Sequence, residues 1–114
     1  MNNLFSLNGI SDDPMLPEYF EPLLCNSSGL RIERIVSCGQ QTPHGKWYDQ
    51  DWDEWVLVLR GEACLGFDDG TEQKLCSGDA LLLTCHTRHR VLFTSTPCIW
   101  LAIHAKELHV PDSQ

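Results

Sequence analysis

The segment 54–61 constrains the fold of this chain more than any other stretch of the sequence. Four consecutive apolar residues, 56–59, stand between a glutamate at position 54 and a glycine at position 61. A short uninterrupted apolar run is typical of a strand that is buried on both faces. Side chains alternate along a strand, which gives two faces: Glu54, Val56 and Val58 on one, and Trp55, Leu57 and Leu59 on the other. The sequence therefore predicts a central strand that carries a carboxylate in line with two valines.

The chain from residue 30 onward has the pattern of short strands separated by turns. Asp68 to Gly70 is a strong hairpin signal, and segments 26–29 and 77–79 are further turn signals. The expected strands are 30–36, 46–50, 54–60, 62–67, 71–75, 80–84, 90–94 and 98–104. No helical periodicity of useful length interrupts them. This spacing predicts an all-β sandwich or barrel.

The 114 residues are enough for one domain with a core. Residues 1–29 contain three prolines and are expected to form an irregular N-terminal arm that packs on the outside of the main body, with one short helical turn at 17–21. Residues 30–105 form the expected β-barrel, and 106–114 a polar C-terminal tail.

Charge and composition exclude several classes of partner. The formal net charge is −8, from 16 acidic and 8 basic residues, which argues against nucleic acid and against an anionic membrane surface. The chain has no apolar run of membrane-spanning length, and its N-terminus lacks the features of a signal peptide, so we expect a cytoplasmic protein. Six cysteines without a Cys-x-x-Cys pair favour reduced thiols over a disulfide framework or a zinc knuckle.

Two motifs within this all-β pattern resemble those of small single-domain cupins. The first has the form Gly-x5-His-x-His-x3–4-Glu-x6-Gly, and Glu54 and Gly61 have the six intervening residues that its end requires. The second has the form Gly-x5-Pro-x-Gly-x2-His-x3-Asn, and Gly78 and His89 have the ten intervening residues that it requires. The resemblance covers residues 31–104. It implies a double-stranded β-helix, the jelly roll or cupin barrel.

The chain departs from these motifs at the positions that usually hold a metal. Cupins usually bind a divalent metal through two histidines and the glutamate of the first motif, and the histidine of the second. Counted back from Glu54, the two histidine positions fall on other residue types: Tyr48 and Gln50 in one frame, or Trp47 and Asp49 in the other. The second motif has three replacements: Thr84 for proline, His86 for glycine and Phe93 for asparagine. The resemblance therefore carries over only Glu54 and His89 as ligand positions.

The leading hypothesis is a small-molecule-binding cupin with a depleted metal-ligand set and a pocket around Glu54 and His89. Tyr48 and Gln50, at the former ligand positions, would contact a small polar or anionic molecule directly. A buried carboxylate needs a partner. If Glu54 is not part of a site, the alternative is an ion pair with Arg88 or Arg90.

The competing hypothesis is a metal-dependent cupin enzyme of the dioxygenase, isomerase or decarboxylase type. The metal would be iron, manganese, nickel or zinc. A transition-metal site needs three or four N, O or S ligands. His86, His89 and Glu54 would hold it, and Asp49 or His104 would complete the set. His104 shares a strand face with Trp100 and enters the barrel if that face points inward. A structural or sensor domain is a third possibility.

The outward faces of two strands predict an assembly. If Glu54 points inward, Trp55, Leu57 and Leu59 point outward, and Ile99, Leu101 and Ile103 form a second apolar face. The arm would cover part of this surface with Leu16, Phe20 and Leu23. Large exposed apolar patches mark interfaces, and twofold packing uses one patch twice. We therefore expect a homodimer that buries on the order of 1,500 Å² or more.

Overall fold

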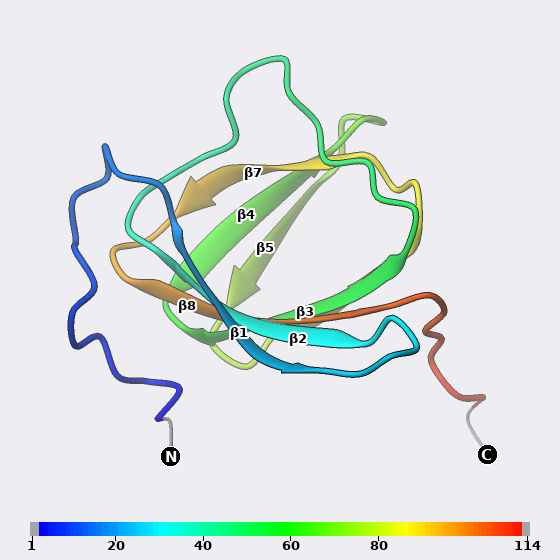
Figure 1. Cartoon of the computed structure of the whole chain (residues 1–114). Coiled ribbons are helices and arrows are strands. Elements are labelled where there is room, and N and C mark those ends of the chain that lie inside the picture. Colours follow the sequence, from blue (N-terminus) through cyan, green and yellow to red (C-terminus); the bar gives the residue numbers. More distant parts are fainter. Residues whose placement is uncertain (1–2, 113–114) are drawn as a thin grey trace.

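The computed structural model describes residues 3–112, which form eight strands in two antiparallel sheets (Figure 1). The strands are β1 (Tyr19–Cys25), β2 (Arg31–Ser37), β3 (Asp53–Arg60), β4 (Glu62–Phe67), β5 (Glu72–Cys76), β6 (Ala80–Leu83), β7 (His89–Thr94) and β8 (Cys98–Ala105). One sheet has the order β1-β2-β8-β3-β6 and the other the order β5-β4-β7. The two sheets face each other and enclose the core, which confirms the predicted all-β jelly roll.

Seven of the eight predicted strands are present, and the differences lie at the N-terminal side. The predicted strand 46–50 makes a single bridge, between Tyr48 and His89. The prediction of a helical turn at 17–21 is wrong, because residues 19–21 begin β1, which pairs with β2. Pro22 does not prevent this pairing, since β1 is an edge strand and its register shifts between Pro22 and Leu24. The N-terminal arm therefore includes one edge strand of the larger sheet.

Strand β3 has the two faces that its sequence predicts. Glu54, Val56 and Val58 are buried, whereas Trp55 is 37% exposed. Val56 and Val58 pack in a cluster with residues of both sheets, among them Leu65 and Trp100. The strand ends at Gly61, where φ is +94° and a Cβ atom would lie 2.4 Å from the carbonyl oxygen of Pro97. A side chain at this position would displace the backbone, which explains the glycine at the end of the first motif.

The arm before β1 runs along one side of the molecule (Figure 1), where it contacts the outer face of the larger sheet. Leu7 and Ile10 pack against a small buried cluster, formed by Val36, Cys38 and Ile99. The guanidinium of Arg34 fastens the arm, since it donates to the carbonyl oxygens of Leu4 at 3.1 Å and Ser6 at 2.6 Å. Of the residues expected to cover this surface, Leu16 lies near Val36 and Cys38 but is half exposed, and Phe20 instead lines the cavity between the sheets. Leu7 and Ile10, nearer the N-terminus, make the buried contacts with the sheet.

The long connection between β2 and β3 runs beside β7 and arches over one end of the barrel (Figure 1). Its backbone pairs with that strand at two places: Thr42 N–H donates to Val91 O at 2.9 Å, and Tyr48 and His89 exchange two hydrogen bonds, of 2.7 and 3.1 Å. These contacts hold the connection in an extended path. They place Tyr48 and Gln50 at the mouth of the barrel.

Within residues 3–112, no helix is long and apolar enough to cross a membrane. All six cysteines carry free thiols, of which Cys98 lies in the core and Cys64 is partly buried.

Candidate functional site

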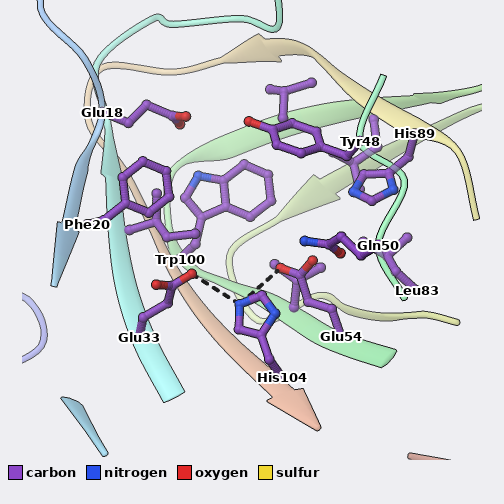
Figure 2. Close-up of a pocket in the computed structure, with 14 residues that line it drawn as sticks. Glu18, Phe20, Glu33, Tyr48, Gln50, Glu54, Leu83, His89, Trp100 and His104 are labelled. Carbon is purple, nitrogen blue, oxygen red and sulfur yellow. Dashed lines mark hydrogen bonds and ion pairs between the residues drawn. The ribbon is translucent and has the colours of Figure 1, made fainter. Parts of the chain in front are cut away.

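A cavity of about 110 Å³ lies between the two sheets (Figure 2). Its lining contains carboxylates, imidazoles, aromatic rings and one amide: Glu18, Glu33, Glu54, His89, His104, Phe20, Tyr48, Trp100 and Gln50. Aliphatic side chains complete it: Ile35, Val56, Leu65, Leu83 and Val91. Trp100 is buried at the inner end, whereas Phe20 and Tyr48 are exposed and form part of the mouth. Polar groups that converge in a largely apolar cavity are the usual features of a binding site.

The four motif positions meet at this cavity. Tyr48, Gln50, Glu54 and His89 all line it, although they come from the long connection, β3 and β7. The Tyr48 ring stacks on the His89 imidazole, with centroids 5.4 Å apart and planes inclined by 22°. The frame that assigns Tyr48 and Gln50 to the former histidine positions is therefore the one that places both side chains in the pocket.

Glu54 is buried, and its environment favours the protonated form. Burial and the nearby negative charge of Glu33 raise the pKa of Glu54 to about 7, although the Gln50 amide and the charge of Arg31 oppose the shift. Burial acts because a low-dielectric environment penalises the charged carboxylate. Near neutral pH both the protonated and the ionised forms of Glu54 are therefore populated, so this carboxyl group can either donate or accept a hydrogen bond.

His104 is held between Trp52 and two carboxylates. The Trp52 indole N–H donates to His104 Nδ1 at 2.8 Å, while His104 Nε2 lies 3.0 Å from Glu33 Oε1 and 3.9 Å from Glu54 Oε2. An indole nitrogen can only donate, so Nδ1 is the unprotonated nitrogen and Nε2–H donates to Glu33. Burial also lowers the pKa of His104, although the hydrogen bond to Glu33 opposes that shift. His104 is therefore a neutral donor with a fixed tautomer.

His89 has the opposite tautomer. Its Nδ1 lies 2.8 Å from the carbonyl oxygen of Thr87, which can only accept, so Nδ1 carries the hydrogen. Burial lowers the pKa of His89, although the same hydrogen bond opposes that shift, so the ring is neutral at pH 7. Its Nε2 lone pair is left as an acceptor.

Glu18 contributes a third carboxylate from the N-terminal arm. Burial raises its pKa, and a hydrogen bond from the Ser37 hydroxyl opposes that shift. Ser37 in turn accepts a hydrogen bond from the Trp100 indole N–H at 3.0 Å. Because the Trp100 nitrogen is satisfied in this way, its ring carbons are the part of the side chain left to face the cavity.

The sequence did not predict a site role for Glu18, Phe20, Glu33, Trp52 or Trp100. Glu33 could have been found from the alternation along β2, which puts it on the same face as Ile35, another residue of the lining. Glu18, Phe20 and Trp52 follow from the paths of the arm and the long connection, for which the sequence has no local signal.

His86 and Asp49 lie outside the pocket, contrary to the expectation for both. His86 Nδ1 meets Asp49 Oδ1 at 2.8 Å on the surface. The backbone explains this placement: His86 has a positive φ of 60°, and its N–H donates to Gln50 O at 2.6 Å, which turns the side chain into solvent. The proposed ligand set of His86, His89 and Glu54 is therefore not brought together. His104, by contrast, enters the pocket as its strand face predicted.

The expected alternative of an arginine partner for Glu54 is also wrong. The guanidinium groups of Arg88 and Arg90 lie 5.4 and 5.8 Å from the centre of the Trp47 ring. Arg88 approaches Asp68 at 3.8 Å, and Arg90 donates to Thr42 O at 3.2 Å. Both arginine side chains therefore bind groups outside the pocket, and neither pairs with Glu54.

The side chains at the motif positions do not fit the usual cupin metal centre. Only Glu54 and His89 offer strong metal-ligating groups. The pKa of the Tyr48 phenol is raised, first by burial and then by the charges of Glu18 and Glu54, so it stays protonated. Both ring nitrogens of His104 are already hydrogen-bonded. Across residues 3–112, no three His, Cys, Asp or Glu side chains are grouped to hold a metal ion.

Known structures share the fold of this chain, and one of them is close enough in sequence to define a family. No protein-family model matches it, and no curated protein does. Among solved structures, it is 39% identical to a candidate mannose-6-phosphate isomerase from Ralstonia eutropha JMP134, with a TM-score of 0.81 over 94% of this chain and 98% of that one. An RmlC-like cupin protein from Desulfovibrio desulfuricans shares the fold at 20% identity and a TM-score of 0.69, over 95% of this chain and 99% of that one. A cupin superfamily protein from Desulfitobacterium hafniense DCB-2 also shares the fold, at 21% identity and a TM-score of 0.68, over 80% of this chain and 79% of that one. The chain belongs to the same family as the Ralstonia protein, and it has the fold of the small RmlC-like cupins.

Proposed function

We propose that this protein binds a small polar molecule in the pocket between its sheets, by direct contacts and without a metal ion. One observation carries the proposal. The four positions that meet in the pocket are those that hold the metal in other cupins, and two of them are Tyr48 and Gln50. A phenol and an amide are weak metal ligands and good hydrogen-bonding groups for an organic molecule.

The lining offers a defined set of hydrogen bonds to such a ligand. Tyr48 can donate, Gln50 can donate and accept, His89 Nε2 accepts, and Glu54 does either. The cavity of about 110 Å³ is small. An apolar cavity of about 150 Å³ in another protein admits benzene, so the part of a ligand that this cavity encloses is no larger than about one unsubstituted ring.

A thermal-shift screen together with elemental analysis tests this function. A ligand specific to the native state should raise the melting temperature of the wild type and of His86→Ala, whose side chain lies outside the pocket. The shift should be lost in Gln50→Leu. Protein purified without chelators should contain iron, manganese, nickel and zinc far below one equivalent. A stoichiometric metal that His89→Ala removes would overturn the proposal.

The near-neutral pKa of Glu54 favours a second function, an enzyme that moves a proton on the bound molecule. A carboxyl group with a pKa of about 7 can give and take a proton at physiological pH, and the Nε2 lone pair of His89 is a base in the same pocket. The Ralstonia protein is named for the isomerisation of a sugar phosphate. Solvent deuterium exchange into bound ligand should then stop in Glu54→Gln while binding persists. Exchange at the wild-type rate in that variant would exclude this role.

The homodimer also stays a proposal. Leu7 and Ile10 cover Leu59 and Ile99, but Trp55 remains exposed on the outer face of β3. Twofold packing would bury it. Sedimentation equilibrium at micromolar concentration should give about twice the chain mass of 12.9 kDa, and a monomer there would reject the dimer.

A further inference from the structure

We infer that the pocket selects a small organic ammonium ion over neutral and anionic molecules of the same shape. This inference rests on the proposed binding function and adds the chemical class of the ligand. It also narrows the expectation from the sequence, which left a polar or an anionic ligand open.

The charges that face the cavity favour a cation. Glu18, Glu33 and Glu54 contribute carboxyl groups, and none of the described lining residues is a lysine or an arginine. Arg34 is engaged by Glu21 at 2.7 Å and by the carbonyl oxygens of the arm. Arg31 lies outside the lining, with its guanidinium 5.3 Å from the centre of the Trp52 ring. An anion in this space would meet two or three carboxyl groups, and Arg31, whose charge reaches Glu54, is not among the lining residues.

The hydrogen-bonding capacity of the lining points the same way, because its acceptors outnumber its donors. Each ionised carboxylate has about four acceptor sites. Ser37 and His104 Nε2 each donate to one of them, at Glu18 and Glu33 respectively. The Nε2 lone pair of His89 adds another acceptor. A ligand that donates hydrogen bonds or carries positive charge therefore satisfies groups that an acceptor-rich ligand, such as a phosphate, would leave unpaired.

The aromatic rings of the lining attract a cation more strongly than a neutral molecule. Phe20, Tyr48 and Trp100 line the same cavity as the three carboxylates, and Figure 2 shows their rings around its upper part. The faces of such rings attract ammonium groups, most strongly where water is excluded. Because Ser37 satisfies the indole nitrogen of Trp100, this ring presents its π-system rather than its N–H. Carboxylates together with aromatic faces are the groups that recognise an organic ammonium ion. A bare metal ion would make no use of the rings.

Calorimetric titration of one isosteric series tests the ligand class. The series is choline, its neutral carbon analogue 3,3-dimethylbutan-1-ol, the primary amine 3,3-dimethylbutylammonium, and the anion 3,3-dimethylbutanoate. At least one of the two cations should bind about tenfold or more tightly than the alcohol, and the anion should bind least. Chelator should leave these affinities unchanged. If the alcohol or the anion binds as tightly as both cations, the inference fails while the proposed binding function stands. If nothing binds here or in the thermal-shift screen, both fail.

The number of protons released or taken up on binding provides a second test, because its sign differs between cationic and anionic ligands. A cation stabilises ionised Glu54, so its binding near pH 7 should release a fraction of a proton, measured from titrations in buffers of different ionisation enthalpy. An anion would instead take up a proton. The release should vanish in Glu54→Gln, which should also lose about tenfold in affinity for the cation and little for the alcohol. Glu107→Gln makes the same change of net charge on an exposed residue of the tail and should behave as wild type. Proton uptake on cation binding, or equal loss in both variants, would overturn the inference.

Discussion

Two histidine–carboxylate pairs of this protein have nearly the same geometry in opposite surroundings. His104 and Glu33 meet at 3.0 Å beside the pocket, where their side chains are 5% and 18% exposed. His86 and Asp49 meet at 2.8 Å at the surface, where their side chains are 66% and 47% exposed. Water screens the surface pair, whereas the low dielectric around the buried pair strengthens its interactions and raises the cost of breaking them.

The comparison shows that contact alone does not identify a functional pair. The buried pair belongs to a chain of polar groups, from the Trp52 indole through His104 to Glu33 and Glu54. The surface pair ends in solvent. The two pairs should therefore respond very differently to the same substitution.

The largest expected difference is the effect of removing each histidine. His104→Ala leaves Glu33 without its donor and opens a cavity beside the core, so we expect a loss of about 3–5 kcal/mol in the free energy of unfolding. His86→Ala breaks a solvated pair and should cost about 1 kcal/mol or less. Urea unfolding of both variants measures the two values. Equal losses would mean that burial does not separate the pairs.

The pH dependence of stability should come next in size. The carboxyl of Glu54 has a pKa of about 7 when folded, against 4.5 for the free side chain, so the folded state holds its proton more tightly. The resulting stabilisation is complete below about pH 4.5 and is lost as the pH rises through about 7. Glu54→Gln has no such titration. Relative to wild type, it should gain on the order of 3 kcal/mol between about pH 5 and pH 8. A difference that stays constant across this range would contradict the raised pKa.

A smaller effect is expected from the residue that fixes the tautomer of His104. Trp52→Phe removes the donor to Nδ1 and should cost about 1–2 kcal/mol. It also frees Nδ1 to take a proton, so the pKa of His104 should rise. Nitrogen-15 NMR of the imidazole should show the Nε2–H tautomer in the wild type and a titrating ring in the variant. An unchanged spectrum would show that the indole does not set the tautomer.

The smallest effect concerns the backbone of the surface pair. His86 has a φ of +60°, a region that a side chain disfavours and glycine tolerates. His86→Gly should therefore offset the lost contact with Asp49 and stabilise the protein by about 0.5 kcal/mol. His86→Ala keeps the unfavourable φ and is the matched control. The glycine variant should have the higher urea midpoint, and the reverse order would contradict this account.

The sequence predicted the parts of the site that depend on alternation along single strands. The burial of Glu54 with Val56 and Val58, and the inward face of His104, follow from period-two patterns in β3 and β8. The position of His89 came from its motif spacing. In each case one strand fixes the direction of the side chain, so a local pattern is sufficient.

The rest of the site depends on pairing between distant segments. Glu54 stands opposite His104 because β3 pairs with β8, and Arg31 stands opposite His104 because β2 pairs with the same strand. No local pattern predicts that register. The direction of the His86 side chain follows from a positive φ in a turn, and its spacing of three from His89 could not reveal it.

The contribution of the N-terminal arm to the pocket has a consequence for how this protein diverges from its relatives. Glu18 and Phe20 come from a segment that precedes both cupin motifs, so substitutions of these two side chains would change the lining of the pocket and leave the motif residues unaltered. If the pocket binds the proposed ligand, its preference can then change while both motifs stay the same. Two cupins with identical motif residues need not share a ligand, and inheritance of function between them should be judged on the arm as well.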